Sequence, residues 1–244
     1  MTATIAPSPA IGETLRRDPG LRLRDYCEAL RWYLELPDQM IDRVVLLENS
    51  RSDLSAFAEL AKRVGATKSL ELLSTSPDAP PERGKGYAES LMIEEGLSRS
   101  NLLRPDSTFW KVTGRLQVLN LATLIRTAPA RFDLYCDLRD VPLIADLLGG
   151  NQWMETRLFA TTPAAYLRLF GGQADCDYVI EKGFYRLVRA ATAANEMNIY
   201  PRFRRQPVLE GFSGASGASY RSLFYRVKGL TRSISRLILP RLWL

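Results

Sequence analysis

The apolar residues of the chain recur at two different spacings, which predict helices alternating with strands. Over residues 21–36 they repeat at helical spacing, as on one face of an amphipathic helix. The largely apolar, β-branched run at 41–47 predicts a buried strand. A second helix is predicted over 52–64, with Ser52 as its cap and Gly65 as its terminator. These elements form one βα unit.

The same alternation continues along the rest of the chain. Further strands are predicted over residues 69–73, 108–112, 132–136 and 153–159, and further helices over 87–99, 116–127, 163–170 and 179–194. Strands that alternate with helices pack as a mostly parallel sheet. The predicted fold is therefore α/β, a mostly parallel open sheet with flanking helices. No apolar run approaches the roughly 20 residues that a bilayer crossing needs.

The two ends of the chain differ from this middle part. Residues 1–20 have no hydrophobic period, which predicts a flexible arm before a domain at 21–218. Residues 219–244 carry an apolar stripe at helical spacing that ends in Trp243, which predicts a C-terminal amphipathic helix. We expect this helix to lie on an anionic membrane surface. The alternatives are docking on the domain or on a partner, and a nucleic-acid arm, which the lack of interleaved aromatic residues disfavours.

The net charge of +6 comes from this tail. All 27 acidic residues lie at or before Glu210. Basic residues continue through the last 24 positions, at Arg221, Arg226, Lys228, Arg232, Arg236 and Arg241. The rest of the chain is close to neutral, so the basic character belongs to the predicted helix.

Composition limits the chemistry that the chain can perform. Its 244 residues include no histidine, which excludes Ser-His-Asp catalysis and histidine-ligated zinc and leaves carboxylates, Lys, Arg and Tyr. Cys27, Cys136 and Cys176 are too scattered for a zinc cage and suit a reducing compartment. Residues 1–13 do not have the pattern of a secretory signal. We therefore expect a cytoplasmic protein.

The first polar motif, Glu48-Asn49-Ser50, directly follows the first predicted strand. Open α/β sheets bind their ligands at the carboxyl ends of their strands. A carboxylate and an amide at this position suit hydrogen bonds to a base or a ribose. A turn that caps the next helix explains the same residues equally well.

A glycine-rich motif, Gly84-Lys85-Gly86, immediately precedes a predicted helix. Two glycines allow close approach of a ligand to the backbone, and a helix N-terminus with a lysine suits a diphosphate. The spacing is not that of a Walker loop. The structural alternative is a turn with a solvated lysine.

The segment from Lys111 to Arg115 joins a predicted strand to a predicted helix. Burial of Lys111 beside an apolar strand end calls for an anionic partner, either a ligand or a carboxylate. Arg115 would open the helix, where a cation is unfavourable unless it binds an anion. With Thr113 between them, these cations predict a binding site for a diphosphate.

Three carboxylates are candidates for the chemical step, and each has an alternative as half of an internal ion pair. They are Asp137 at a strand end, Glu155 next to Arg157, and Glu181 in a helix. Asp175 and Asp177 match the D-x-D metal motif, but a chain with thirteen aspartates gives about one such match by chance.

From residue 41 to residue 220 the chain resembles bacterial GT-A-like glycosyltransferases of surface-polysaccharide gene clusters. The resemblance rests on VVLLENSRSDL, RGKGYAES, FWKVTGRL, METRLFATTP and PVLEGFSGASG. It implies that the first strand end and the GKGY and KVTGR segments face a nucleotide sugar, and that later segments, including Glu210 and Ser213, receive the acceptor. Where D-x-D is usual, the strand ends in KVTGR, so we expect no cofactor and no divalent metal.

The resemblance implies transfer of a sugar from a nucleoside diphosphate sugar to a lipid-linked saccharide. Lys85, Lys111 and Arg115 would stabilise the leaving diphosphate, and one of the three carboxylates would act on the acceptor. The enzyme would work at the inner face of the cytoplasmic membrane. A non-catalytic protein that binds nucleotide sugars or assembles on the membrane is the first alternative, and a nucleic-acid-binding protein is the second.

Overall fold

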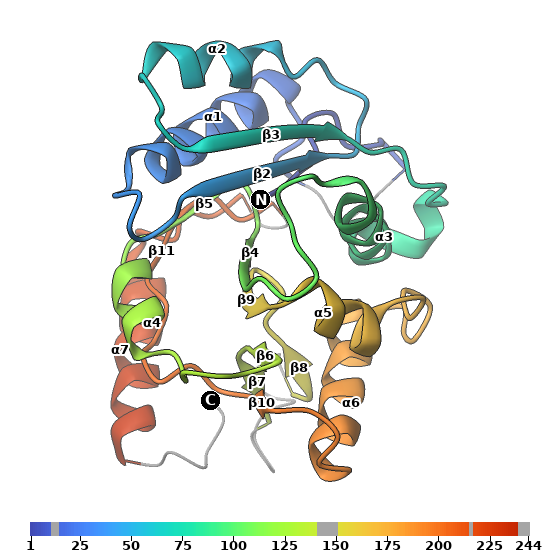
Figure 1. The fold of residues 1–244 in the computed structure, drawn as a ribbon, viewed down its shortest axis with the longest axis vertical. Helices are drawn as coiled ribbons and strands as arrows, with labels where there is room; N and C mark the ends of the chain where they lie inside the picture. The colour runs from blue at the N-terminus through green and yellow to red at the C-terminus, as the bar shows by residue number, and fades with distance from the viewer. Residues whose placement is uncertain (11–14, 141–150, 215–216, 239–244) are drawn as a thin grey trace. The chain divides into compact units, whose positions relative to one another are not determined.

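The computed structural model describes residues 1–10, 15–140, 151–214 and 217–238. The chain forms two compact units that interleave along the sequence (Figure 1). Unit 1 contains Met1–Leu103, Val112–Leu119 and Leu209–Ser222, and unit 2 contains Arg104–Lys111, Asn120–Val208 and Leu223–Leu244. Both units combine helices and strands, so the predicted α/β class is confirmed. The unit boundaries cut across the single domain expected over 21–218.

Unit 1 is built on a parallel sheet with the strand order β1-β2-β3. Its strands are β1 (Thr2–Ala3), β2 (Arg43–Glu48) and β3 (Ser69–Ser74), and its helices are α1 (Pro19–Glu35), α2 (Ser55–Arg63) and α3 (Gly84–Arg99), the last preceded by the 3₁₀ helix η1 (Pro81–Arg83). Leu47 of β2 pairs with Thr2 on one side and with Leu73 on the other. Figure 1 shows α1 and α2 on one side of β2 and β3, and α3 on the other.

The amino-terminal segment contributes a strand, although the sequence suggested a loose arm over residues 1–20. β1 pairs in parallel with β2, and the amino group of Met1 donates to the Val45 carbonyl at 2.6 Å. Ala3 and Ile5 are buried. Two buried residues are too few to produce a hydrophobic period, so sequence periodicity does not detect this strand.

A two-stranded antiparallel sheet completes unit 1. It consists of β5 (Leu116–Val118) and β11 (Leu209–Gly211). The hydroxyl of Tyr33 in α1 donates to the Leu116 carbonyl at 2.9 Å, which ties this sheet to α1. The helix predicted over 116–127 is wrong in its first part, because Leu116 and Val118 alternate into the core as strand residues. Arg115 therefore does not open a helix.

Unit 2 contains a mixed sheet with the strand order β10-β6-β9-β4 and a separate antiparallel pair, β7-β8. The strands are β4 (Phe109–Val112), whose residues up to Lys111 belong to this unit, β6 (Leu134–Tyr135), β7 (Leu138–Arg139), β8 (Trp153–Met154), β9 (Leu158–Thr161) and β10 (Ile199–Tyr200). β10 pairs in parallel with β6, and β6 pairs antiparallel with β9. The strand predicted over 153–159 is thus two strands, and residues 155–157 form the connection between them.

Aromatic side chains fill much of the core of unit 2. Tyr135 and Phe203 meet edge to face with their ring centroids 4.6 Å apart, and Trp110 lies 6.1 Å from each of them. Phe170 stacks on Phe184 with a centroid separation of 4.0 Å, which joins α5 to α6. The helices of this unit are α4 (Leu121–Thr127), α5 (Pro163–Phe170), α6 (Ile180–Ala193) and α7 (Leu223–Ile238).

Helix ends follow the predicted signals only in part. Gly65 adopts a φ of 59° directly after Val64, the C-cap residue of α2, as the prediction of a glycine terminator requires. Ser52 is not the cap of α2, because the helix begins at Ser55 after Leu54, and Asp53 accepts the Ser55 amide at 3.0 Å. The Ser52 amide donates instead to Glu48 at 3.2 Å.

The predicted C-terminal amphipathic helix is present as α7, which belongs to unit 2. Its apolar stripe is exposed, with Leu223, Val227, Leu230, Ile234 and Ile238 between 46% and 75% accessible. The end of the tail, including Arg241 and Trp243, lies outside the described residues. In the part of the chain that the structure describes, no helix combines the length and apolar character of a membrane span.

Gly114 is required by a close backbone approach, and this explains one residue of the KVTGR segment without a ligand. Its amide donates to the Thr2 carbonyl at 2.8 Å, and a Cβ atom at Gly114 would lie 2.7 Å from the same oxygen. Gly114→Ala should therefore lower the free energy of unfolding by about 1–3 kcal/mol, the cost of overpacking. Urea unfolding measures this change.

Gly229→Ala is the matched control. A Cβ atom there meets no heavy atom within 4 Å, so alanine in the interior of α7 should raise stability by about 0.5–1 kcal/mol. Equal stability of Gly114→Ala and the wild type would show that β1 does not pack against residue 114.

Candidate functional site

The residues named from the sequence fall into two groups, one in each unit. Unit 1 contains Glu48, Asn49, Ser50, Gly84, Lys85, Gly86, Thr113, Arg115, Glu210 and Ser213, and unit 2 contains Lys111, Asp137, Glu155, Arg157 and Glu181. The residues expected to bind the donor are thus in unit 1, apart from Lys111. The residues expected to act in the chemical step are all in unit 2.

Glu48 organises the carboxyl end of β2. Its side chain is fully buried, and its Oε1 atom accepts the Ile5 amide at 3.0 Å and the Ser50 amide at 2.9 Å. The Ser50 hydroxyl and the Ser52 amide also donate to this carboxylate. These four donors hold the loops after β1 and β2 together. Glu48 therefore stabilises these two loops. Its carboxylate is already bonded to protein donors, which does not support the prediction that it contacts a base or a ribose.

Asn49 and Ser50 lie at the surface of this edge and are half-buried. The Thr4 hydroxyl donates to Asn49 Oδ1 at 2.6 Å, and the Ala6 amide donates to the Ser50 hydroxyl at 2.9 Å. Among the described residues, no hydrogen bond is found from the Asn49 side-chain NH₂ group. This donor remains at the carboxyl end of a parallel sheet, where the sequence predicted it.

Two arginines of the same unit, Arg22 and Arg115, also bear on this region. Arg22 is buried, and its guanidinium donates to the Thr4 carbonyl at 2.6 Å and to the Tyr26 hydroxyl at 2.9 Å. Burial lowers the pKa of Arg22, and the charge of Arg115 lowers it further. Arg115 donates through Nε to the Phe212 carbonyl at 2.9 Å. Within the described chain its two terminal nitrogens make no hydrogen bond.

Thr113 and the glycine motif also belong to unit 1. Thr113 forms a parallel bridge with Thr2, so the KVTGR segment runs beside β1. Gly84, Lys85 and Gly86 make up the first residues of α3, and Gly84 has a φ of 78°. The positive φ explains the first glycine by backbone geometry. Lys85 is exposed at this helix start.

The two residues expected to receive the acceptor lie at the β11 end of unit 1. Glu210 is half-buried and forms an ion pair with Arg221. The Ser213 amide donates to the Ala218 carbonyl at 2.9 Å, and the Ser213 carbonyl accepts the Gly217 amide at 2.8 Å. These contacts lie within the segment 209–222, and Glu210 also pairs with Gln117 across the β11-β5 sheet.

Lys111 has a different environment from Arg115. It is 3% exposed, and its ammonium group donates to the Thr156 carbonyl at 2.6 Å and lies 5.9 Å from the centre of the Phe159 ring. The sequence predicted that Lys111 would bind a carboxylate or an anionic ligand, but the partner in this contact is a backbone carbonyl. Lys111 and Arg115 belong to different units, and the contacts found for them involve different residues. The structure therefore does not support the prediction that the two cations bind one diphosphate together.

Glu155 is held between two arginines in the β8-β9 connection. Arg139 donates to it at 2.5 Å, and Arg157 donates through Nε at 2.6 Å and through a second nitrogen. Burial works against the ionised form, but the neighbouring guanidinium groups outweigh it and hold the pKa of Glu155 well below the usual range of a glutamate. A carboxylate held ionised in this way is a poor general base at neutral pH.

Asp137, like Glu155, is held in an ion pair with arginine. Arg236 of α7 donates to both of its oxygens, at 2.9 Å for Oδ1, and the Phe203 amide donates to Oδ1 at 3.2 Å. The two side chains are only 6% and 11% exposed. The tail helix is therefore fixed to unit 2 through a buried ion pair, and Asp137 serves this attachment.

The remaining carboxylates have local partners. Glu181 accepts from the Thr156 hydroxyl at 3.4 Å. Asp177 accepts the Val179 amide and pairs with Arg186, which lowers its pKa. In the described ranges no group of three or more Cys, Asp or Glu residues is arranged to hold a metal ion.

Sequence reasoning missed the arginines that gather around Asp137 and Glu155. They are Arg139, Arg157, Arg202, Arg232 and Arg236, of which only Arg157 was predicted to be a site residue, whereas Arg232 and Arg236 were noted only as basic residues of the tail. The one signal in the sequence is the spacing of Arg232 and Arg236, which lie one turn apart on α7 and opposite its apolar stripe.

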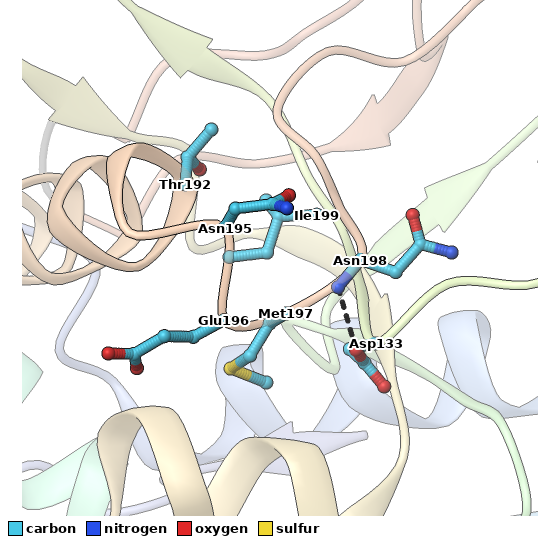
Figure 2. Close-up of a pocket in the computed structure, with 7 residues that line it drawn as sticks. All are labelled: Asp133, Thr192, Asn195, Glu196, Met197, Asn198 and Ile199. Atoms are coloured by element: carbon cyan, nitrogen blue, oxygen red, sulfur yellow. Dashed lines mark hydrogen bonds between the residues drawn. The ribbon is translucent and has the colours of Figure 1, made fainter.

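A polar pocket of about 370 Å³ lies at the end of α6 in unit 2, where Asn195 adopts a φ of 54° (Figure 2). Its lining residues are Asp133, Thr192, Asn195, Glu196, Met197, Asn198 and Ile199. The Asn198 amide donates to Asp133 at 2.7 Å, so polar groups of this pocket join the loop before β10 to the start of β6. It contains none of the residues named from the sequence, and we assign it no function.

Comparisons with known proteins bear on the fold. No family model matches the chain, and no curated protein matches it. The inositol-1-phosphate CTP transferase from T. maritima superposes with a TM-score of 0.52 at 10% identity, over 93% of this chain and 94% of that one. HddC from Yersinia pseudotuberculosis gives a TM-score of 0.33 at 13% identity, over 67% and 69% of the two chains, and supports no inference.

At 10% identity the first likeness establishes a shared α/β fold and no more. It covers nearly the whole of both chains, so it includes both units of the present one. That protein carries the name of a CTP transferase, so the likeness lends no support to the glycosyltransferase family that the motifs suggest.

The ion pairs of Glu155 should make stability depend on pH. The folded-state pKa of Glu155 lies below the ordinary value of about 4.3, so the stabilisation is complete above that value and is lost as the pH falls below it. Glu155→Gln should cost about 2–3 kcal/mol at pH 7, less than the roughly 3–5 kcal/mol of a fully buried pair because its arginines are partly exposed.

Urea unfolding of both proteins between pH 7 and pH 3 measures this dependence. The difference between Glu155→Gln and the wild type should be constant from pH 7 to about 5 and should shrink below about 4.3. Exposed Asp42→Asn is the control, because its side chain is 69% exposed. A difference that stays the same down to pH 3 would show that Glu155 is not held ionised by the arginines.

Proposed function

We propose that the protein is a transferase that binds a nucleotide sugar at the carboxyl end of β1 and β2 in unit 1. The placement of Asn49, Ser50 and Arg115 in this unit is the observation that carries the proposal. Parallel sheets of α/β proteins bind nucleotides at such an edge. The fold likeness to a CTP transferase over nearly the whole chain supports a nucleotide as the ligand.

The available donors match the parts of a nucleotide sugar. The side-chain NH₂ group of Asn49 suits a carbonyl oxygen of a pyrimidine base. The terminal nitrogens of Arg115 suit a phosphate, which guanidinium groups bind with two parallel hydrogen bonds. The charge of the nearby Arg22 adds to the attraction for an anion. These features favour a nucleoside diphosphate over a neutral ligand.

Glycosyl transfer to a saccharide acceptor is the reaction that we propose. The bond between the sugar carbon and the diphosphate oxygen breaks, a bond from that carbon to the oxygen of an acceptor hydroxyl forms, and the hydroxyl proton passes to a base. Arg115 would stabilise the diphosphate that leaves. Asp137 and Glu155 are committed to ion pairs and Glu181 belongs to unit 2, so we propose none of these three carboxylates as the base for a donor bound in unit 1.

Nucleotidyl transfer is the second candidate, and the fold likeness favours it. In that reaction a sugar phosphate attacks a nucleoside triphosphate and pyrophosphate leaves. The two reactions release different products from different donors, since glycosyl transfer releases a nucleoside diphosphate. A protein that binds the nucleotide sugar without turnover remains the third alternative.

Arg115→Met tests the proposed nucleotide site. It should weaken the binding of UDP- or CDP-linked sugars by about 1.5–3 kcal/mol, the contribution of a charged hydrogen bond, without unfolding unit 1. Isothermal titration calorimetry measures the affinity. Arg24→Met is the matched control, because Arg24 is an exposed arginine of α1 in the same unit. Equal affinity of the two folded variants would exclude Arg115 from the site.

A product assay then separates the reactions. The wild type is supplied with a nucleotide sugar and a saccharide, or with a nucleoside triphosphate and a sugar phosphate. Nucleoside diphosphate release that falls in Arg115→Met supports glycosyl transfer, and pyrophosphate release in the second mixture supports nucleotidyl transfer. Nucleotide binding without either product identifies a binding protein.

We also propose that α7 attaches the protein to an anionic membrane by its exposed apolar stripe. No acidic residue follows Glu210, so the carboxyl-terminal part of the chain does not repel anionic lipid. Arg232 and Arg236 face unit 2, however, and are not free to contact lipid. Attachment should therefore depend more on apolar burial, and less on salt, than the sequence suggests.

Leu230→Glu should reduce binding to phosphatidylglycerol vesicles without lowering stability, because Leu230 is 62% exposed and a carboxylate there would enter the lipid interface. Vesicle co-sedimentation measures the change. Leu167→Glu, at an exposed apolar position of α5 in the same unit, is the matched control. Sedimentation of Leu230→Glu at the level of the control would rule out this face of α7 as the membrane contact.

A further inference from the structure

Five arginines gather around two carboxylates in unit 2, and we call them the arginine cluster: Arg139, Arg157, Arg202, Arg232 and Arg236. Arg139 and Arg157 share Glu155, and Arg236 binds Asp137. The charges of all four of Arg139, Glu155, Asp137 and Arg157 act on Arg232. Arg202 donates to Ser235 of α7 at 3.2 Å and is influenced by Arg236 and Asp137.

The cluster has more positive charge than its carboxylates can balance. Among the residues that the structure describes, five guanidinium groups face two carboxylates, an excess of three positive charges. The next groups outward are Lys111, Glu181 and Asp140, and Asp140 accepts from the Tyr185 hydroxyl. With these included, six cations face four anions in this part of the described chain, and the excess is still two.

Two of the arginines carry this excess. The Nε and Nη1 atoms of Arg202 are buried, and in the described part of the chain they have no hydrogen-bond partner. Burial, followed by the repulsion of Arg139, lowers the pKa of Arg232 to about 10. A buried guanidinium without a partner is costly, and like charges nearby add to the cost. An anion at this place would remove both penalties.

The cluster also has an open side. The side chains of Arg139 and Arg157 keep 16% and 28% of their surface exposed, whereas that of Arg236 keeps 6%. A ligand would therefore approach from the β7-β8 side and meet Arg232 and Arg202 further inside. Glu155 and Asp137 would serve as fixed supports that orient the guanidinium groups around it.

We infer that the arginine cluster binds a phosphate group. An excess of two to three charges matches a phosphate monoester, which carries about two negative charges near neutral pH, or a diphosphate, which carries more, better than it matches a carboxylate. Guanidinium forks bind phosphate oxygens with paired hydrogen bonds. The inference stands on unit 2 alone and does not depend on the nucleotide site proposed in unit 1.

The test is calorimetric titration of the full-length protein with inorganic phosphate and with pyrophosphate, at a constant ionic strength set with chloride. Saturable binding of either anion is expected. Arg202→Met and Arg232→Met should each weaken it at least tenfold. Neither variant breaks the pairs of Asp137 or Glu155, so both should be as stable as the wild type in phosphate-free buffer, or more stable.

Arg126→Met is the matched control, because Arg126 is an exposed arginine of α4 in the same unit and its replacement changes the net charge equally. It should bind both anions as the wild type does. Should Arg202→Met and Arg232→Met fail to fold, a wild type that binds no phosphate compound still refutes the inference, and binding that survives in Arg115→Met is independent of the site proposed in unit 1 and supports it.

A vesicle arm identifies the source of the phosphate group. Wild type and Arg202→Met are compared on vesicles of phosphatidylcholine with and without phosphatidic acid. Binding to phosphatidic acid that Arg202→Met loses, without binding of soluble phosphate, would assign the cluster to a lipid headgroup. Binding of soluble anions that the variants lose assigns it to a soluble phosphate. No saturable binding in either arm, or binding unchanged in both variants, overturns the inference.

Discussion

The buried ion pair between Asp137 and Arg236 determines which face of the C-terminal helix α7 packs against the rest of unit 2. An unpaired charge at either position would be severely destabilising, so the pair fixes the orientation of α7 about its axis. Arg232 and Ser235 then also face unit 2, and the apolar stripe faces outward. This is the reverse of the usual amphipathic helix, whose apolar face covers the core. The arginine cluster and the exposed stripe both follow from this one contact.

Elements with a strong local pattern were predictable from the sequence. The apolar run before Glu48 and the glycine after α2 led to β2 and to the end of α2. Strands that depend on pairing with a distant part of the chain were not predictable from the sequence. β1 contains two residues and exists because it pairs with β2, and β5 exists because it pairs with β11, about 90 residues further along the chain. Local apolar spacing does not contain this information.

The candidate site shows the same division. The rule that ligands bind at the carboxyl ends of parallel strands placed Asn49 and Ser50 at an accessible edge. The roles of the carboxylates were not predictable, because a buried support and a catalytic base look alike in a sequence. Asp137 and Arg236 are 99 positions apart, and only the folded chain brings them together. The four donors to Glu48 likewise come from two loops that the sequence does not join.

A chain without histidine has few groups that change charge near neutral pH. In unit 2, Glu155 stays ionised because its pKa is held well below the usual range, and even the lowered pKa of Arg232, about 10, keeps that group protonated. The charge of the arginine cluster is therefore constant across the neutral range. The second ionisation of a phosphate monoester falls near pH 6, so any pH dependence of phosphate binding there would come from the ligand. The charge of a site built from arginine and carboxylate stays constant near neutral pH, so its affinity for a phosphate compound would change with pH only as the ligand itself ionises.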